Sequence, residues 1–246
     1  MEPRQFYSLF MIAALAVFLL ARYLIPKPAT YQALPWRKRA LLGLAALVGG
    51  AFGAKLPFVL SPQEGWLGGP AWIADGKTIT TGLIGAYLAV EIAKLALGIH
   101  VKTGDTFALP LALAMAVGRL GCFFNGCCAG LPTALPWGVD FGDGVRCHPT
   151  QLYECVFHLI MAGVLWELMR RNWLRNQRLK LYLIAYGCFR FLTEFIRPEP
   201  RGWLGLTFYQ WVALFLIVAM TIQWQVDRPP RKSTQDAEPQ FADLVH

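Results

Sequence analysis

Charged side chains are scarce in this chain. Only 15% of its 246 residues are Asp, Glu, Lys or Arg, whereas 56% are hydrophobic, and the mean hydropathy is +0.42. A soluble domain of this length would carry far more charge, so the composition excludes an ordinary soluble protein. The net charge of +8 would suggest nucleic acid as the partner of a soluble protein. Here the apolar excess favours basic flanks of membrane segments instead, and we expect no nucleic-acid partner.

The sequence also lacks internal repeats and low-complexity tracts, and its length suits one polytopic domain. The first hydrophobic run, residues 6–25, is too long and apolar for a signal peptide, and no small-residue cleavage site follows it. Arg22 and Lys27 flank its end. We therefore expect this run to be a membrane anchor.

The hydrophobic runs predict an all-α membrane protein with about seven transmembrane helices, each near the ~20 residues that a helix needs to cross a bilayer. The predicted spans are 6–25, 40–60, 79–99, 106–124, 151–170, 180–197 and 205–225. We expect residues 1–227 to form a single integral membrane domain. Residues 228–246 are polar, which predicts a disordered tail.

Basic residues are concentrated in alternate loops. They are frequent in the 26–39 loop, in the 171–180 loop and in the C-terminal tail, and sparser in the loops between. The positive-inside bias predicts an extracytoplasmic N-terminus and a cytoplasmic C-terminus. This orientation would gather the polar residues of the spans in the outer leaflet, which favours chemistry at the outer surface of a cytoplasmic membrane.

The sixth predicted span carries a polar stripe. Tyr186, Arg190, Glu194 and Arg197 are spaced four, four and three residues apart, so they share one helix face. Such a stripe faces protein or a water-filled cavity rather than lipid. Two cations against one carboxylate favour an anion site in which one guanidinium group stays free. The alternative is a structural ion pair between helices.

A second arginine ends the fourth predicted span. Arg119 is followed by Asn125 and by the glycines Gly121, Gly126 and Gly130, which would let the backbone approach a ligand or a neighbouring helix. Arg119 could simply snorkel outward. Alternatively, arginines from two helices, Arg119 and Arg190, could hold one phosphodiester by forked hydrogen bonds.

The fifth predicted span opens with His148, Pro149, Gln151 and Glu154. Pro149 suits the first turn of a helix, and Gln151 and Glu154 fall on one side of that helix. A neutral imidazole at His148, near the membrane surface, would be able to act as a base. His158, in mid-span, is expected to be structural.

These motifs resemble the prolipoprotein diacylglyceryl transferase family of bacterial inner membranes. The resemblance covers roughly residues 79–211 and rests on Gly118–Gly130, His148–Glu154 and Tyr186–Arg197. It implies a multi-pass protein of that membrane that uses phosphatidylglycerol, or another anionic phospholipid, and a prolipoprotein signal peptide, without a cofactor. A lipobox cysteine thiol would attack the glyceryl carbon that bears the phosphate, and glycerol phosphate would leave. By this resemblance Arg119 and Arg190 are the central catalytic residues, and we expect His148 or Glu154 to be the catalytic proton acceptor. The expected substrate-binding residues are Asn125, Gly130, Tyr186, Glu194, Gln151, Arg197 and Thr80.

Three positions depart from the family pattern. Cys122 stands where the family has Asn, Cys127 where it has Glu, and Thr80 where it has a His that is a proposed base. These departures concern acceptor binding and proton transfer rather than phosphate binding by Arg119 and Arg190. They keep two alternatives open: a different acceptor, or a phospholipid-binding protein without catalysis.

Four of the six cysteines are close to one another in the sequence: Cys122, Cys127, Cys128 and Cys147. At an oxidising outer face, a disulfide from Cys127 or Cys128 to Cys147 is one interpretation. A metal site completed by Cys147 and His148 is a less favoured one, and a reactive thiol is another. The other two cysteines, Cys155 and Cys188, are expected to pack inside helices.

Overall fold

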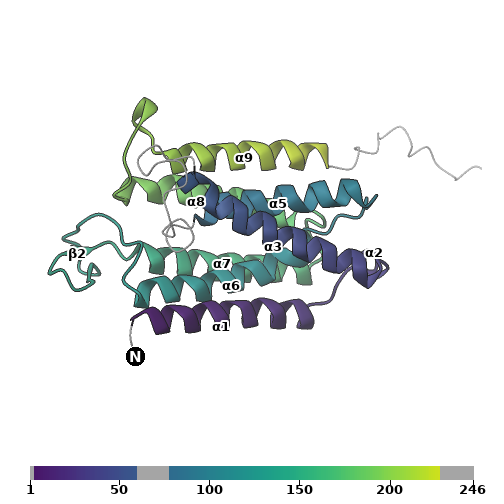
Figure 1. Ribbon diagram of the computed structural model, residues 1–246, viewed down its shortest axis with the longest axis horizontal. Coiled ribbons are helices and arrows are strands. Elements are labelled where there is room, and N and C mark those ends of the chain that lie inside the picture. Colours follow the sequence, from purple (N-terminus) through teal and green to yellow (C-terminus); the bar gives the residue numbers. More distant parts are fainter. Residues whose placement is uncertain (1–2, 60–77, 228–246) are drawn as a thin grey trace, which may run out of the picture.

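The computed structural model describes residues 3–59 and 78–227, which form a helical bundle with one small hairpin. The elements are α1 (Pro3–Leu24), α2 (Ala29–Gln32), α3 (Trp36–Val59), α5 (Ile79–Ala96), α6 (Asp105–Phe124), β1 (Val139–Asp140), β2 (Arg146–Cys147), α7 (Thr150–Arg170), α8 (Arg178–Thr193), η2 (Glu194–Ile196), η3 (Trp203–Gly205) and α9 (Phe208–Val226). The long helices lie side by side with roughly parallel axes (Figure 1). The predicted tail, 228–246, and the last residue of the second predicted span lie outside the described residues.

Within the described residues, six helices are long and apolar enough to cross a membrane: α1, α3, α5, α6, α7 and α9. The chain is therefore a multi-pass membrane protein, as its composition predicts. The sixth predicted span corresponds to α8, a shorter helix of 16 residues that continues into the 3₁₀ turn η2. It packs against α6, α7 and α9, so seven helices of 16 residues or more form the bundle in the described part of the chain.

The predicted end of the sixth span at 197 is too late for the α-helix. Pro198 follows Arg197, and a proline disfavours helical backbone in the residue before it. Arg197 is accordingly extended, with φ −106° and ψ 150°. The last helix starts at Phe208 rather than 205 because Thr207 and Gln210 form a capping box that fixes its first turn.

Apolar side chains cover the outer surface of the bundle. On α1, for example, Leu9, Ile12, Leu15 and Leu19 are all more than half exposed. A soluble protein rarely exposes such a continuous apolar face. A lipid environment accounts for it, because acyl chains solvate these side chains.

Glycines allow α3 and α5 to touch backbone to backbone. A Cβ added to Gly85 would lie 2.3 Å from the carbonyl oxygen of Gly49 and 2.9 Å from the Cα of Gly53. Small residues at this spacing are typical of closely packed membrane helices. The contact fixes α5, and with it the buried Thr80 at its start.

The bundle has two polar ends. The hairpin β1–β2, which pairs Val139 with Cys147, projects from the end where α1 begins, and α9 ends at the opposite one (Figure 1). At that opposite end Lys102 and Lys180 both bind the carboxylate of Asp227. The two ends of the described chain thus lie on opposite sides of the bundle, as the predicted topology requires. Which of these sides faces the cytoplasm stays a prediction.

Candidate functional site

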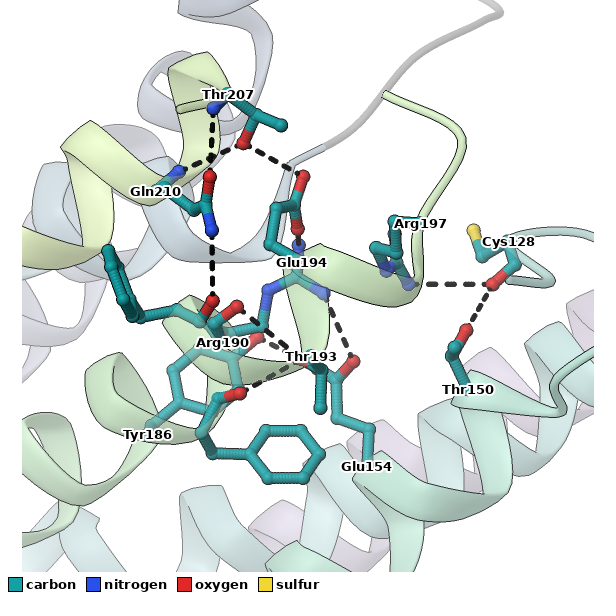
Figure 2. Close-up of polar contacts among 12 residues, drawn as sticks. Cys128, Thr150, Glu154, Tyr186, Arg190, Thr193, Glu194, Arg197, Thr207 and Gln210 are labelled. Atoms are coloured by element: carbon teal, nitrogen blue, oxygen red, sulfur yellow. Dashed lines mark hydrogen bonds and ion pairs between the residues drawn. The ribbon is translucent and has the colours of Figure 1, made fainter. Parts of the chain in front are cut away.

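A buried carboxylate on α7 collects groups from two other helices. The Glu154 Oε1 atom lies 2.6 Å from Arg119 Nη2 on α6 and accepts a hydrogen bond from the Tyr186 hydroxyl on α8 at 2.8 Å. Its Oε2 atom lies 3.7 Å from Arg190 Nη1 (Figure 2). The two arginines are each 6% exposed and Glu154 is 1% exposed. The two guanidinium groups expected to meet therefore do meet, and Glu154 brings them together.

Arg190 is also held from its other side. Its Nη2 donates to Glu194 Oε2 at 2.9 Å, one helical turn further along, and the Thr207 hydroxyl donates to Glu194 Oε1 at 3.3 Å (Figure 2). Gln210 donates to the carbonyl oxygen of Phe191 at 3.3 Å, which ties α9 to the end of α8.

Two arginines retain unused donors. The Nε atoms of Arg119 and Arg197 are buried and have no hydrogen-bond partner among the described residues. Arg197 forms one long hydrogen bond, from Nη2 to the carbonyl oxygen of Cys128 at 3.4 Å. Arg119, Arg190 and Arg197, together with Glu154 and Glu194, are called the arginine centre below. It contains three guanidinium groups against two carboxylates. The positive excess and the unused donors suit an anion with several oxygens.

Two residues at the start of α7, Thr150 and the predicted substrate-binding residue Gln151, position the loop after α6. Gln151 Nε2 donates to the carbonyl oxygen of Cys127, and the Thr150 hydroxyl donates to that of Cys128, both at 2.6 Å. Gly130, also predicted to bind substrate, belongs to this loop, and an added Cβ there would come within 2.6 Å of the Ile196 carbonyl oxygen. The motif that begins α7 thus fixes the loop that carries the cysteines.

This loop brings three cysteines together. Gly126, with φ +67°, ends α6 in a Schellman turn in which the Cys127 amide donates to the Cys122 carbonyl at 3.2 Å. The sulfur atoms of Cys122, Cys127 and Cys128 all lie within 4.8 Å of one another. Asn125, predicted to bind substrate, is the C-cap of α6 beside them.

Cys147, the fourth cysteine of the sequence cluster, is not part of this group and lies in β2 opposite Val139. All six cysteines are described, and all are free thiols. The disulfide to Cys147 considered from the sequence is therefore not present in this structure.

Two further predicted residues do not join the centre. The half-buried His148 has its Nδ1 atom 3.2 Å from the Tyr153 hydroxyl, which accepts a hydrogen bond from Trp137. Thr80 is 2% exposed at the start of α5. Within the described residues, no hydrogen bond or ion pair links either one to Glu154.

His158, which we expected to be structural, lies at the centre. It is fully buried, with Nε2 3.7 Å from Glu154 Oε1 and Nδ1 2.9 Å from the Tyr182 hydroxyl. The signal available in the sequence was its position four residues after Glu154, which places both on one helix face. A histidine in mid-span gave no reason to favour that contact over simple packing.

Comparison with known proteins points to one family. The family description "Prolipoprotein diacylglyceryl transferase" matches residues 3–226, which includes the first 78 residues, where the sequence motifs gave no resemblance. A phosphatidylglycerol–prolipoprotein diacylglyceryl transferase of Bordetella avium is 34% identical over 226 residues, 85% of each chain. Proteins of the same name from Clostridium tetani and Polynucleobacter necessarius are 31% and 33% identical, over 76% and 82% of this chain and 80% and 81% of their own.

Proposed function

Because the chain belongs to the prolipoprotein diacylglyceryl transferase family, we propose that it transfers a diacylglyceryl group from phosphatidylglycerol to the cysteine thiol of a prolipoprotein. The acceptor sulfur forms a bond to the glyceryl carbon. The bond from that carbon to the phosphate oxygen breaks, and glycerol phosphate leaves with the electron pair. The thiol proton passes to a base or to water.

The observation that carries this proposal is the meeting of Arg119 and Arg190 on Glu154. Buried guanidinium groups with forked donors recognise a phosphodiester and stabilise the charge that grows on the leaving phosphate. Glu154 and Glu194 hold the two side chains in place before the lipid arrives, so little reorganisation is needed during the reaction. The unused Nε atom of Arg119 supplies a further donor.

The geometry separates the two predicted proton acceptors. Glu154 already accepts from Arg119 and Tyr186, which makes it a positioning carboxylate rather than a free base. His148 is half-buried near the hairpin end of the bundle, and its Nδ1 atom contacts the Tyr153 hydroxyl rather than a guanidinium or carboxylate group. We therefore assign proton acceptance to His148 and positioning of the arginines to Glu154.

We further propose that the hairpin end faces the outside of a bacterial inner membrane, with the N-terminus outside and the C-terminus in the cytoplasm. The basic loops 26–39 and 171–180 support this orientation. It would present the arginine centre to the outer leaflet, where prolipoproteins arrive after export.

The test is transfer by the purified full-length chain in vesicles that contain phosphatidylglycerol and a lipobox peptide. Mass spectrometry would detect the thioether, and a coupled assay would measure glycerol phosphate. We expect product with phosphatidylglycerol and none with phosphatidylcholine. Arg119→Lys and Arg190→Lys keep the positive charge beside Glu154 but lose the paired N–H donors of the guanidinium group. Each should therefore reduce kcat/KM at least 100-fold, which corresponds to about 2.7 kcal/mol of transition-state stabilisation.

Arg170→Lys is the matched control. Arg170 is exposed at the far end of α7, where it pairs with Glu167, and its replacement should leave the rate unchanged. Full activity of both Arg119→Lys and Arg190→Lys would contradict the mechanism. Saturable phosphatidylglycerol binding with no thioether product would instead support the phospholipid-binding alternative, which the replacements at Thr80, Cys122 and Cys127 motivate.

A further inference from the structure

The arginine centre leaves the three-cysteine cluster without a role. We propose that Cys122, Cys127 and Cys128 bind one zinc ion, and that the acceptor thiol takes its fourth coordination position. The second half of this inference rests on the proposed transferase function; the metal site itself does not.

The sulfur positions suit the ion. Zinc bound by cysteine has Zn–S distances of about 2.3 Å, which places the sulfurs of a tetrahedral site roughly 3.8 Å apart. The three sulfur atoms already lie within 4.8 Å of one another. They need to close by no more than about an ångström, which side-chain rotation alone can supply.

The backbone holds the three cysteines in this arrangement. The Schellman turn at Gly126 places Cys127 beside Cys122, and Cys128 adopts φ +66°, a conformation that costs a residue with a side chain about 1 kcal/mol or more. The carbonyls of Cys127 and Cys128 are fixed by Gln151 and Thr150. A strained turn held from outside by two short hydrogen bonds is typical of a preorganised ligand site.

The charges around the cluster are complementary. Three thiolates and one Zn²⁺ carry a net charge of −1. Arg119 Nη1 lies 3.9 Å from Cys122 Sγ, and Arg197 donates to the Cys128 carbonyl. Positive groups on both sides would stabilise the anionic complex, and they place it directly beside the proposed phosphate site.

The fourth position would be open to a substrate. Within the described residues, no fourth Cys, His, Asp or Glu belongs to the group, and Cys128 is exposed. Zinc with three protein ligands and one open position is typical of catalytic rather than structural sites. Thiolate ligands favour a thiophilic ion over magnesium or calcium.

The chemistry then follows from coordination. Binding to zinc deprotonates a thiol, so the acceptor would enter as a thiolate, and its proton would pass to His148, the proton acceptor proposed above. Its sulfur would attack the glyceryl carbon of the neighbouring phospholipid, and the phosphate would leave with the bonding electrons of the C–O bond. The thioether formed carries no charge and is a weaker ligand, so the product would dissociate from the metal.

The first test measures metal and not activity. The full-length chain, purified in detergent without chelator, should contain about one zinc per chain by elemental mass spectrometry. Reconstitution of the metal-free protein with Co²⁺ should produce the near-ultraviolet absorption of cobalt–thiolate bonds. Cys127→Ser and Cys128→Ser should each lose both signals. Cys188→Ser, an exposed cysteine on α8, and Cys147→Ser should retain them.

Zinc-free protein with a disulfide among the three cysteines, or with all three freely alkylated, would overturn the site. Equal metal loss from Cys147→Ser would overturn a three-ligand site with an open position. The second test compares metal-free and zinc-loaded protein in the vesicle assay. We expect at least a 100-fold lower transfer rate without zinc and unchanged phosphatidylglycerol binding. Equal rates would overturn the acceptor role.

The readouts separate the two proposals. Failure of the transferase proposal would leave the zinc content and the cobalt spectrum intact. Failure of the zinc proposal would leave the dependence of activity on Arg119 and Arg190 intact.

Discussion

The Arg119 guanidinium lies 2.6 Å from the Glu154 carboxylate, although 35 residues separate the two in the sequence and they belong to different helices. Both side chains are almost fully buried. An unpaired charge in this position would cost several kcal/mol, so each residue offsets the cost of burying the other. The pair connects folding to function, because the same carboxylate that allows Arg119 to be buried also aligns it with Arg190.

Replacing Glu154 with glutamine should therefore destabilise the protein strongly. Glu154→Gln keeps the shape but leaves two buried guanidinium groups without their shared partner, and we expect a loss of about 3 kcal/mol of stability. A thermal unfolding scan in detergent would measure it. Glu167→Gln on the same helix removes a solvent-exposed carboxylate that pairs with Arg170 and Arg171, and it should have little effect. Comparable losses in both variants would contradict the central role of Glu154.

Gly130 should not tolerate a methyl group. In Gly130→Ala the new Cβ would lie 2.6 Å from the Ile196 carbonyl and 2.9 Å from His148 Cβ, so the cysteine loop would have to move. Overpacking of this kind costs about 1–3 kcal/mol. Chemical denaturation or a thermal scan would measure it, together with transfer activity. Gly163→Ala, in the middle of α7 with nothing within 4 Å, should be neutral or stabilising. An unchanged Gly130→Ala protein would rule out tight packing at this loop.

The start of α9 depends on its cap. Thr207→Ala removes the hydroxyl that accepts from the Gln210 amide and donates to Glu194, so we expect a loss of about 0.5–2 kcal/mol together with lower activity through Arg190. Thr221→Ala, later on the same helix, loses only a hydrogen bond to the Ile217 carbonyl at an exposed position. Equal effects of the two substitutions on activity would show that Thr207 does not support the arginine centre.

The opposite end of the bundle should be sensitive to acid through Asp227. Burial opposes ionisation of this carboxyl, but hydrogen bonds from Lys102 and Lys180 outweigh it and lower its pKa below the ordinary value of 3.8. Its contribution to stability is thus present above that pH and is lost as the pH falls through the lowered value.

Unfolding scans between neutral pH and pH 3 would test this. Asp227→Asn should be less stable at pH 7, by about 1 kcal/mol at most because solvent screens the pair, and its curve should converge with that of the unaltered protein in acid. Asp143→Asn, in the exposed hairpin loop, is the control and should track the unaltered protein throughout. A constant difference at every pH would contradict the assignment.

Much of the fold could be predicted from the sequence because it depends on local chemistry. Hydrophobic runs set the transmembrane helices, and the spacing of Tyr186, Arg190 and Glu194 placed them on one face of α8. Local signals also set element ends: Pro198 stops the helical conformation at Arg197, and Thr207 with Gln210 starts α9. The sixth predicted span ends too late and the seventh starts too early because hydropathy does not respond to a proline or a capping box.

The tertiary structure alone decided which of these groups meet. From the sequence, Glu154 and His148 were catalytic candidates and His158 was expected to be structural, but only helix packing brings Glu154 between Arg119 and Arg190, with His158 beside it. It likewise joined Cys122 to Cys127 and Cys128 instead of joining any of them to Cys147. The physical reason is that contacts between helices depend on how closely their backbones approach and at which register, and those distances arise from the summed packing of the whole bundle rather than from any one motif.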